Sequence, residues 1–186
     1  MKSIRSIIFV CVLLLCLSVS TSFAADGIYY IGTGDVIEIS VWKDPDLSRT
    51  VIVPPDGVIS FPLIDSIRVT NLTVDDLDKI ITKKLSEFVP DVTVTVMLTE
   101  INSLKAYVIG KVATAGMFDI TLDTNVMQIL AQAGGLTPFA SDGNILILRQ
   151  KNNQITKIPF DYGEVQKGKN LDQNILLQPG DVVVVP

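Results

Sequence analysis

The sequence predicts an α+β protein: a small β-sheet domain that carries one helix, followed by a β-grasp domain. Most segments alternate apolar and polar residues, which is typical of half-buried strands. One segment in each half instead repeats apolar residues at helical spacing. Gly-Asp-Val followed by a β-branched run occurs at 34–36 and again at 180–182, and marks the opening and closing strands of the folded part.

The first 24 residues predict a secretory signal peptide that is removed before Ala25. Lys2 and Arg5 form a basic start, residues 7–17 an apolar core, and Ser22-Phe23-Ala24 a small-x-small cleavage site. Two alternatives remain. An uncleaved anchor would need roughly 20 apolar residues, and four hydroxyls interrupt the run at 18–22. A lipid on Cys16 would need small residues just before it, where Leu15 is large.

The composition of the predicted mature chain excludes several kinds of chemistry. Both cysteines, Cys11 and Cys16, leave with the signal, and the chain has no histidine. Thiol nucleophiles, Ser-His-Asp triads, imidazole metal ligands and disulfides are therefore excluded. The mature chain keeps 13 Lys and Arg against 20 Asp and Glu, a formal net charge of −7. Such an acidic chain is a poor nucleic-acid binder, so no nucleic-acid partner is expected.

The first half predicts strands on both sides of a proline-rich turn. Residues 36–42 alternate, and further strands are predicted at 49–53 and 58–63. Pro54-Pro55-Asp56-Gly57 between the last two predicts a turn, because Pro fixes φ and Gly57 accepts positive φ.

One helix completes this half. Leu77, Ile80, Ile81, Leu85 and Phe88 fall at helical spacing. Thr73 with Asp76 resembles a capping box, and Pro90 is expected to close the helix. Strict alternation at 92–99 then predicts a strand with Val92, Val94, Val96 and Leu98 facing inward.

The second half predicts the order strand, strand, helix, strands, which is that of a β-grasp. Strands are expected at 105–110 and 116–120, and a hairpin pairs 144–150 with 154–160 across residues 151–153. The helix between these pairs takes Thr124 as N-cap, and Gly134-Gly135 supplies its left-handed stop. Segment 174–178 predicts one more short strand, and 182–185 the last one.

The two Gly-Asp pairs are interpreted as turns. A phosphate cradle needs its glycines to lead into a helix, whereas Gly34-Asp35 and Gly180-Asp181 both lead into strands. Glycine then takes a positive-φ turn position, and aspartate bonds local backbone N–H groups.

No catalytic, cofactor-binding or metal-binding residues are predicted. The carboxylate pairs Asp75-Asp76 and Asp44/Asp46, together with Asp142, are better explained as a helix first turn and solvated loops. The basic cluster Lys79, Lys83 and Lys84 is expected to be a solvated helix face. Four aromatic residues are candidates for stacking on sugar rings, although core or interface packing is the commoner role: Tyr29, Tyr30, Trp42 and Tyr107.

The ordered segments resemble a known family. "YYIGTGDVIEISVW", "VIVPPDGVISFPLI", "LTVDDLDKIITKKL" and "PDVTVTV" are similar to the export domain of the outer-membrane polysaccharide export (Wza-like) family. "VIGKVATAGMFDI", "VMQILAQAGGLTPFAS" and "ILLQPGDVVVVP" resemble its soluble-ligand-binding β-grasp (SLBB) module. The resemblance covers residues 29–186, with one such module and no membrane-spanning helix.

The resemblance implies a periplasmic, outer-membrane-associated component of capsule or exopolysaccharide export. The expected organisation is a signal peptide at 1–24, an export domain at 25–102 and an SLBB domain at 103–186. The expected assembly is a homo-oligomeric ring through which polysaccharide passes. Its expected partners are an inner-membrane polysaccharide co-polymerase or chain-length regulator and a separate outer-membrane β-barrel. The alternative is a periplasmic glycan-binding module that forms no conduit.

Overall fold

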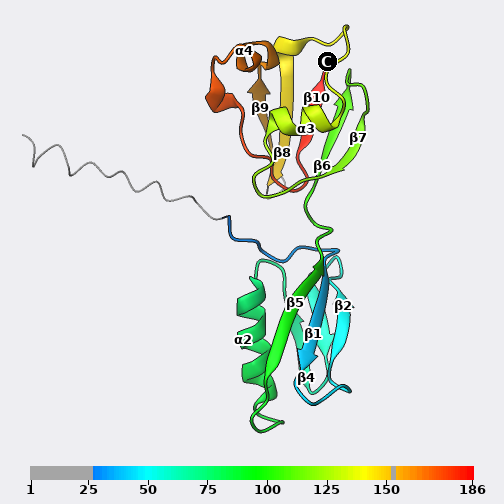
Figure 1. The fold of residues 1–186 in the computed structure, drawn as a ribbon, viewed down its shortest axis with the longest axis vertical. Coiled ribbons are helices and arrows are strands. Elements are labelled where there is room, and N and C mark those ends of the chain that lie inside the picture. The colour runs from blue at the N-terminus through cyan, green and yellow to red at the C-terminus, as the bar shows by residue number, and fades with distance from the viewer. Residues whose placement is uncertain (1–26, 152–153) are drawn as a thin grey trace, which may run out of the picture.

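The chain folds into two lobes, each with its own hydrophobic core. The computed structural model describes residues 27–151 and 154–186. The lobes lie end to end in Figure 1, joined by residues 101–104. The first core gathers buried residues from Ile31 to Val96, and the second from Ala106 to Val185. The mixed α+β class is confirmed. The predicted signal peptide, with Cys11 and Cys16, lies outside the described residues.

The first lobe combines a three-stranded sheet, a hairpin and one helix. Its elements are β1 (Val36–Val41), β2 (Arg49–Ile52), β3 (Val58–Phe61), β4 (Ile64–Arg68), α2 (Val74–Leu85) and β5 (Val94–Glu100). The antiparallel sheet has the order β2-β1-β5, and β3 pairs with β4 separately. Alternation buries Ile37, Ile39, Val94 and Val96 on one face, as the sequence predicts.

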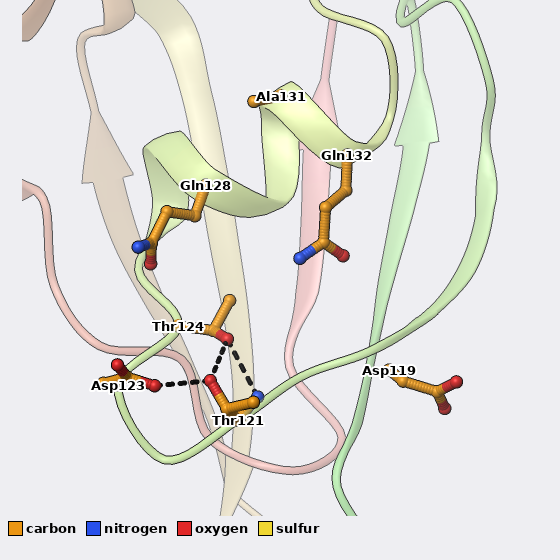
Figure 2. A pocket seen from close by; sticks show the side chains of 7 residues that line it. All are labelled: Asp119, Thr121, Asp123, Thr124, Gln128, Ala131 and Gln132. Carbon is orange, nitrogen blue, oxygen red and sulfur yellow. Dashed lines mark hydrogen bonds between the residues drawn. The ribbon is translucent and has the colours of Figure 1, made fainter.

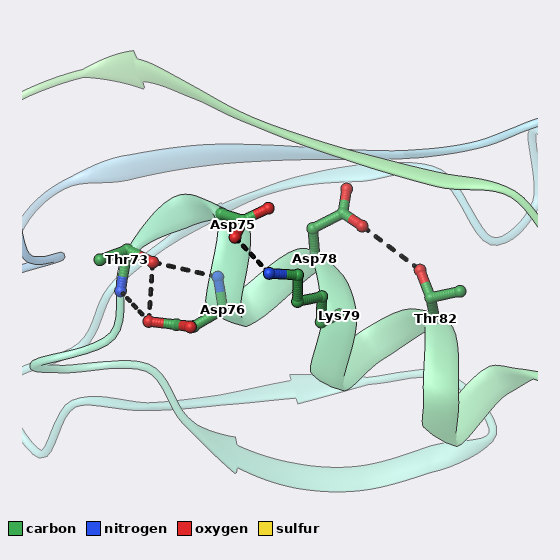
Figure 3. Close-up of polar contacts among 6 residues, drawn as sticks. All are labelled: Thr73, Asp75, Asp76, Asp78, Lys79 and Thr82. Carbon is green, nitrogen blue, oxygen red and sulfur yellow. Dashed lines mark hydrogen bonds and ion pairs between the residues drawn. The ribbon is translucent and has the colours of Figure 1, made fainter.

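Helix α2 is fixed at its start and along its length by polar contacts (Figure 3). The Thr73 hydroxyl accepts the Asp76 N–H at 3.1 Å, and the Asp76 carboxylate accepts the Thr73 N–H, which confirms the capping box. Hydrogen bonds from Thr73 hold the pKa of the Asp76 carboxyl below its usual range. Asp78 accepts the backbone N–H of Val96 at 3.2 Å and so ties the helix to β5.

The second lobe is a five-stranded sheet with helices packed on one face. Its elements are β6 (Lys105–Gly110), β7 (Gly116–Asp119), α3 (Val126–Gln132), β8 (Ile145–Lys151), β9 (Gln154–Phe160), α4 (Tyr162–Gln166) and β10 (Val182–Val185), with 3₁₀ turns η1 (Asp142–Asn144) and η2 (Leu171–Gln173). The strand order is β7-β6-β10-β8-β9, and β10 runs parallel to β6. Helix α3 packs on the sheet through its buried side chains Val126, Ile129 and Leu130. This helix-on-sheet arrangement is a β-grasp.

Several predicted boundaries are wrong. Helix α2 ends at Leu85, with Ser86 as its C-cap, so Phe88 lies outside the helix and Pro90 does not close it. Asn125, not Thr124, caps α3, because its side chain accepts the Gln128 N–H at 3.0 Å.

Three elements differ more substantially. Segment 174–178 is no strand and makes only an isolated bridge, Asn125 with Leu176. The first half contains two sheets rather than one, and strand β4 and helix α4 were not predicted. Across the described residues, no helix is both long enough and apolar enough to cross a membrane.

Candidate functional site

The junction between the lobes is organised around the buried carboxylate of Asp35, which is 0% exposed. Its Oδ1 accepts the backbone N–H groups of Asn102 and Ser103, both at 2.9 Å. Its Oδ2 accepts the Gly32 N–H at 2.8 Å and the hydroxyls of Tyr29 and Ser103. A buried charge is tolerated when donors surround it in this way. Asp35 therefore fastens the segment that leads into the second lobe to the first turn of the first lobe.

Tyr29 is the aromatic member of this junction. Its hydroxyl contacts both Asp35 and Ser103, the latter at 2.9 Å. Burial, and next the hydrogen bond to Asp35, raise the pKa of Tyr29 to about 12. The phenol is protonated at neutral pH and donates its hydrogen bond to the Asp35 carboxylate.

Two glycines are constrained at the junction: Gly34 by the positive φ that the sequence analysis predicted, and Gly32 by a contact that the sequence analysis missed. Gly34 has φ +90°, the left-handed conformation that favours glycine. Gly32 is constrained by space instead, because a Cβ there would lie 2.4 Å from the Ser103 Cβ. Gly32, Asn102 and Ser103 are junction residues that the sequence pattern did not reveal, since each acts through a contact distant in the chain.

The second Gly-Asp pair forms a different site. Gly180 has φ +86°, and Asp181 is 1% exposed. The Asp181 carboxylate accepts Arg149 Nε at 3.0 Å and an Arg149 terminal nitrogen at 2.7 Å, which is a bidentate ion pair. It also accepts the Gln178 N–H at 2.9 Å. This contact joins β8 to the entry of β10 within one lobe.

The remaining predicted turn glycines lie where chain reversals occur. Gly57 has φ +71°, and Gly134 and Gly135 follow α3 with φ +78° and +82°.

The four sugar-contact candidates do not form one platform. Tyr29 is engaged at the junction. Tyr30 and Trp42 are 53% and 71% exposed, and lie before and after β1, so the strand separates them. Tyr107 is on β6 in the other lobe and is 41% exposed.

A polar groove of about 530 Å³ lies beside α3 (Figure 2). Most of its polar atoms have partners: Thr121 and Thr124 bond each other, Asp123 accepts from Thr121, and Gln128 accepts the N–H of Asn125. In Figure 2, Gln132 projects from α3 over the groove. The groove offers hydroxyl, amide and carboxylate groups, which are the types that bind sugar hydroxyls.

A second, apolar cavity of about 400 Å³ adjoins the junction. It is lined chiefly by Tyr29, by Ile101 and Leu104 of the joining segment, and by Ile120 and Leu122 of the second lobe.

Two of the carboxylate candidates are engaged in local contacts. Asp75 pairs with Lys79 at 2.5 Å on exposed α2 (Figure 3), and Asp44 accepts the N–H of Leu47 at 3.2 Å. In the part of the chain that the structure describes, no three Asp, Glu, His or Cys side chains gather closely enough to hold a metal ion.

Comparison with known proteins identifies both lobes. Residues 24–99 match the family described as polysaccharide biosynthesis/export protein, and residues 104–185 match the SLBB domain. The chain therefore joins a domain of the polysaccharide biosynthesis/export family to an SLBB domain. The residues between the two matched segments, 100–103, include Asn102 and Ser103, whose N–H groups bind Asp35 of the export domain.

Curated relatives of this family are similar over most of the chain. The EPS I polysaccharide export outer membrane protein EpsA of Ralstonia nicotianae is 29% identical over 182 residues, which cover 84% of this chain and 47% of that protein. The capsule polysaccharide export outer membrane protein CtrA of Neisseria meningitidis is 26% identical over 191 residues, covering 90% and 48%. The polysialic acid transport protein KpsD of Escherichia coli is 24% identical over 159 residues, covering 84% and 28%. The chain thus spans about half the length of EpsA and CtrA, and less of KpsD.

Proposed function

We propose that this protein is a periplasmic, outer-membrane-associated component of a capsule or exopolysaccharide export system, and that it assembles into a ring through which the polymer passes. The observation that carries the proposal is the succession of an export domain and an SLBB domain over residues 24–99 and 104–185. Relatives whose names state polysaccharide export or transport are similar to both parts.

The proposed domains are residues 25–102 and 103–186, behind a signal peptide at 1–24. A conduit of two stacked tiers requires each domain to keep its place relative to the other. The Asp35 junction supports such a constraint, because it fixes Asn102 and Ser103 of the joining segment to the export domain. Small domains gain stability by packing on neighbouring copies, and head-to-tail contacts close into rings when the rotation permits.

The proposed role is transport rather than catalysis. In this proposal the polymer is synthesised before it reaches the ring. The inner surface of the ring then has to contact sugars only weakly, because the polymer must keep moving through it. Among the four aromatic candidates from the sequence, Trp42 and Tyr30 are the most exposed, at 71% and 53%, and they are proposed to make such contacts. No cofactor is required. The proposed partners are an inner-membrane co-polymerase or chain-length regulator and a separate outer-membrane protein.

Deletion of the gene in its own host tests the function. Surface polysaccharide should fall sharply while polymer of normal composition accumulates inside the cell envelope, and the wild-type chain supplied in trans should restore export. Loss of all polymer, retained and exported, would indicate a role in synthesis. Unchanged surface polysaccharide would show that the protein is not an export component.

A further inference from the structure

The five-stranded sheet of the SLBB domain has a second face that none of the described helices covers. Most of the residues that point to this outer sheet face are apolar, and they include Tyr107, Ile109, Met117, Leu146, Val182 and Val184. The strand register places them side by side, because Val182 pairs with Tyr107, Val184 with both Ile109 and Leu146, and Tyr107 with Met117. Their neighbours in sequence, such as Val108 and Val183, are buried under α3.

The outer sheet face is exposed in the isolated chain. Tyr107, Ile109 and Met117 are 41%, 46% and 54% exposed. A contiguous apolar patch on a soluble protein marks an interaction site. The outward face of the export-domain sheet is more mixed, since Ile52 and Met97 lie there among the polar residues Glu38, Ser40, Thr50 and Thr95.

Charge indicates which surface covers this face. The charged residues of the outer sheet face are two lysines, Lys105 and Lys157, and one aspartate, Asp119. The Asp119 Oδ1 lies 3.9 Å from the Lys105 Nζ. The segments that hold the helices of the opposite side, residues 121–144 and 161–173, carry five carboxylates against two lysines: Asp123, Asp142, Asp161, Glu164 and Asp172 against Lys167 and Lys169. The same segments expose the apolar side chains of Phe139 and Leu171, at 81% and 60%.

We propose that the outer sheet face of one SLBB domain packs against the acidic, helix-bearing side of the SLBB domain in a second copy of this chain. Face-to-face packing of two identical outer faces would bring like charges together, whereas outer face against helical side brings opposite charges together. The contact uses two different surfaces of one domain, so it is head-to-tail, and such contacts close into a ring when the rotation permits. This inference rests on the proposed ring and names the surfaces that form it.

Sedimentation velocity of the purified full chain tests the contact. Wild type should assemble, and Met117→Glu and Ile109→Glu should each raise the concentration needed for assembly at least ten-fold. Ile109→Lys should have a smaller effect than Ile109→Glu, because the lysine would face carboxylates. The matched control is Met97→Glu, which places the same change on a 45% exposed methionine of the export sheet and should assemble as wild type does.

The outcomes separate this inference from the proposed function. Normal assembly of both glutamate variants, with unchanged far-UV spectra, would overturn the contact while leaving the ring in place through another surface. Equal effects of Ile109→Glu and Ile109→Lys would overturn the head-to-tail arrangement. A wild-type chain that stays monomeric at every concentration would overturn both the proposed contact and the proposed ring. Binding of that monomer to anionic phospholipid vesicles would not change this conclusion.

Discussion

The two Gly-Asp turns of this protein have the same local sequence and different roles. Asp35 is surrounded by neutral donors, two of which are backbone N–H groups 67 and 68 residues away, and it joins the export domain to the segment that leads onward. Asp181 is paired with a guanidinium inside the SLBB domain. A short turn motif therefore specifies the local backbone, while the surrounding fold decides whether its carboxylate couples domains or stabilises one of them.

The largest effect is expected at Asp181. In Asp181→Asn the Arg149 side chain, only 19% exposed, loses its counter-charge. Removing one partner of a buried ion pair costs about 3–5 kcal/mol. Urea denaturation followed by hydrogen exchange should show the loss in the SLBB domain, with the export domain unchanged. An equal loss in both domains would contradict the view that this aspartate acts within one lobe.

The matched substitution, Asp35→Asn, should lower the free energy of unfolding by less than Asp181→Asn does, but its effect should extend into the joining segment. Asn keeps one carbonyl acceptor but presents an N–H₂ group towards the Gly32 N–H, so at least one donor loses its partner. The expected cost is about 1–3 kcal/mol, because the partners left behind are neutral. Amide exchange at Asn102 and Ser103 should accelerate, and it should not accelerate in Asp181→Asn. Unchanged exchange rates at these two amides would contradict the view that Asp35 holds the joining segment to the export domain.

The smallest effect is expected from Tyr29→Phe, and it depends on pH. The folded-state pKa of Tyr29 is raised to about 12 from its ordinary 10.0. A raised pKa means that folding favours the protonated phenol, so its contribution to stability is complete below pH 10 and is lost as pH rises towards 12. The difference in unfolding free energy between wild type and Tyr29→Phe, about 1 kcal/mol at pH 8, should therefore shrink by pH 11. A difference that stays constant or grows would contradict this assignment.

The sequence predicts features that depend on neighbouring residues. The Thr73–Asp76 capping box and the inward alternation of Val94 and Val96 need only a few consecutive positions, and both are confirmed. The class of the fold follows from the order of such segments. Asn125 was missed as the cap of α3 because Thr124 beside it is also of a residue type that is favoured at helix N-caps.

Features that depend on distant contacts were not predictable. Strand β4 lacks clear alternation, since Ile64 and Ile67 are both buried three positions apart and the register shifts near Phe61. The five residues of α4 are too few to show a helical period. The Asp35 junction requires Ser103, 68 residues away, and no local pattern links the two.

Electron microscopy of the full chain, purified from cells together with its envelope partners, tests the proposed conduit most directly. The account predicts closed rings of a single rotational order, with a central opening and two tiers that correspond to the export and SLBB domains. Isolated two-lobed particles or open chains at every protein concentration would contradict it, and would favour a glycan-binding module that forms no conduit.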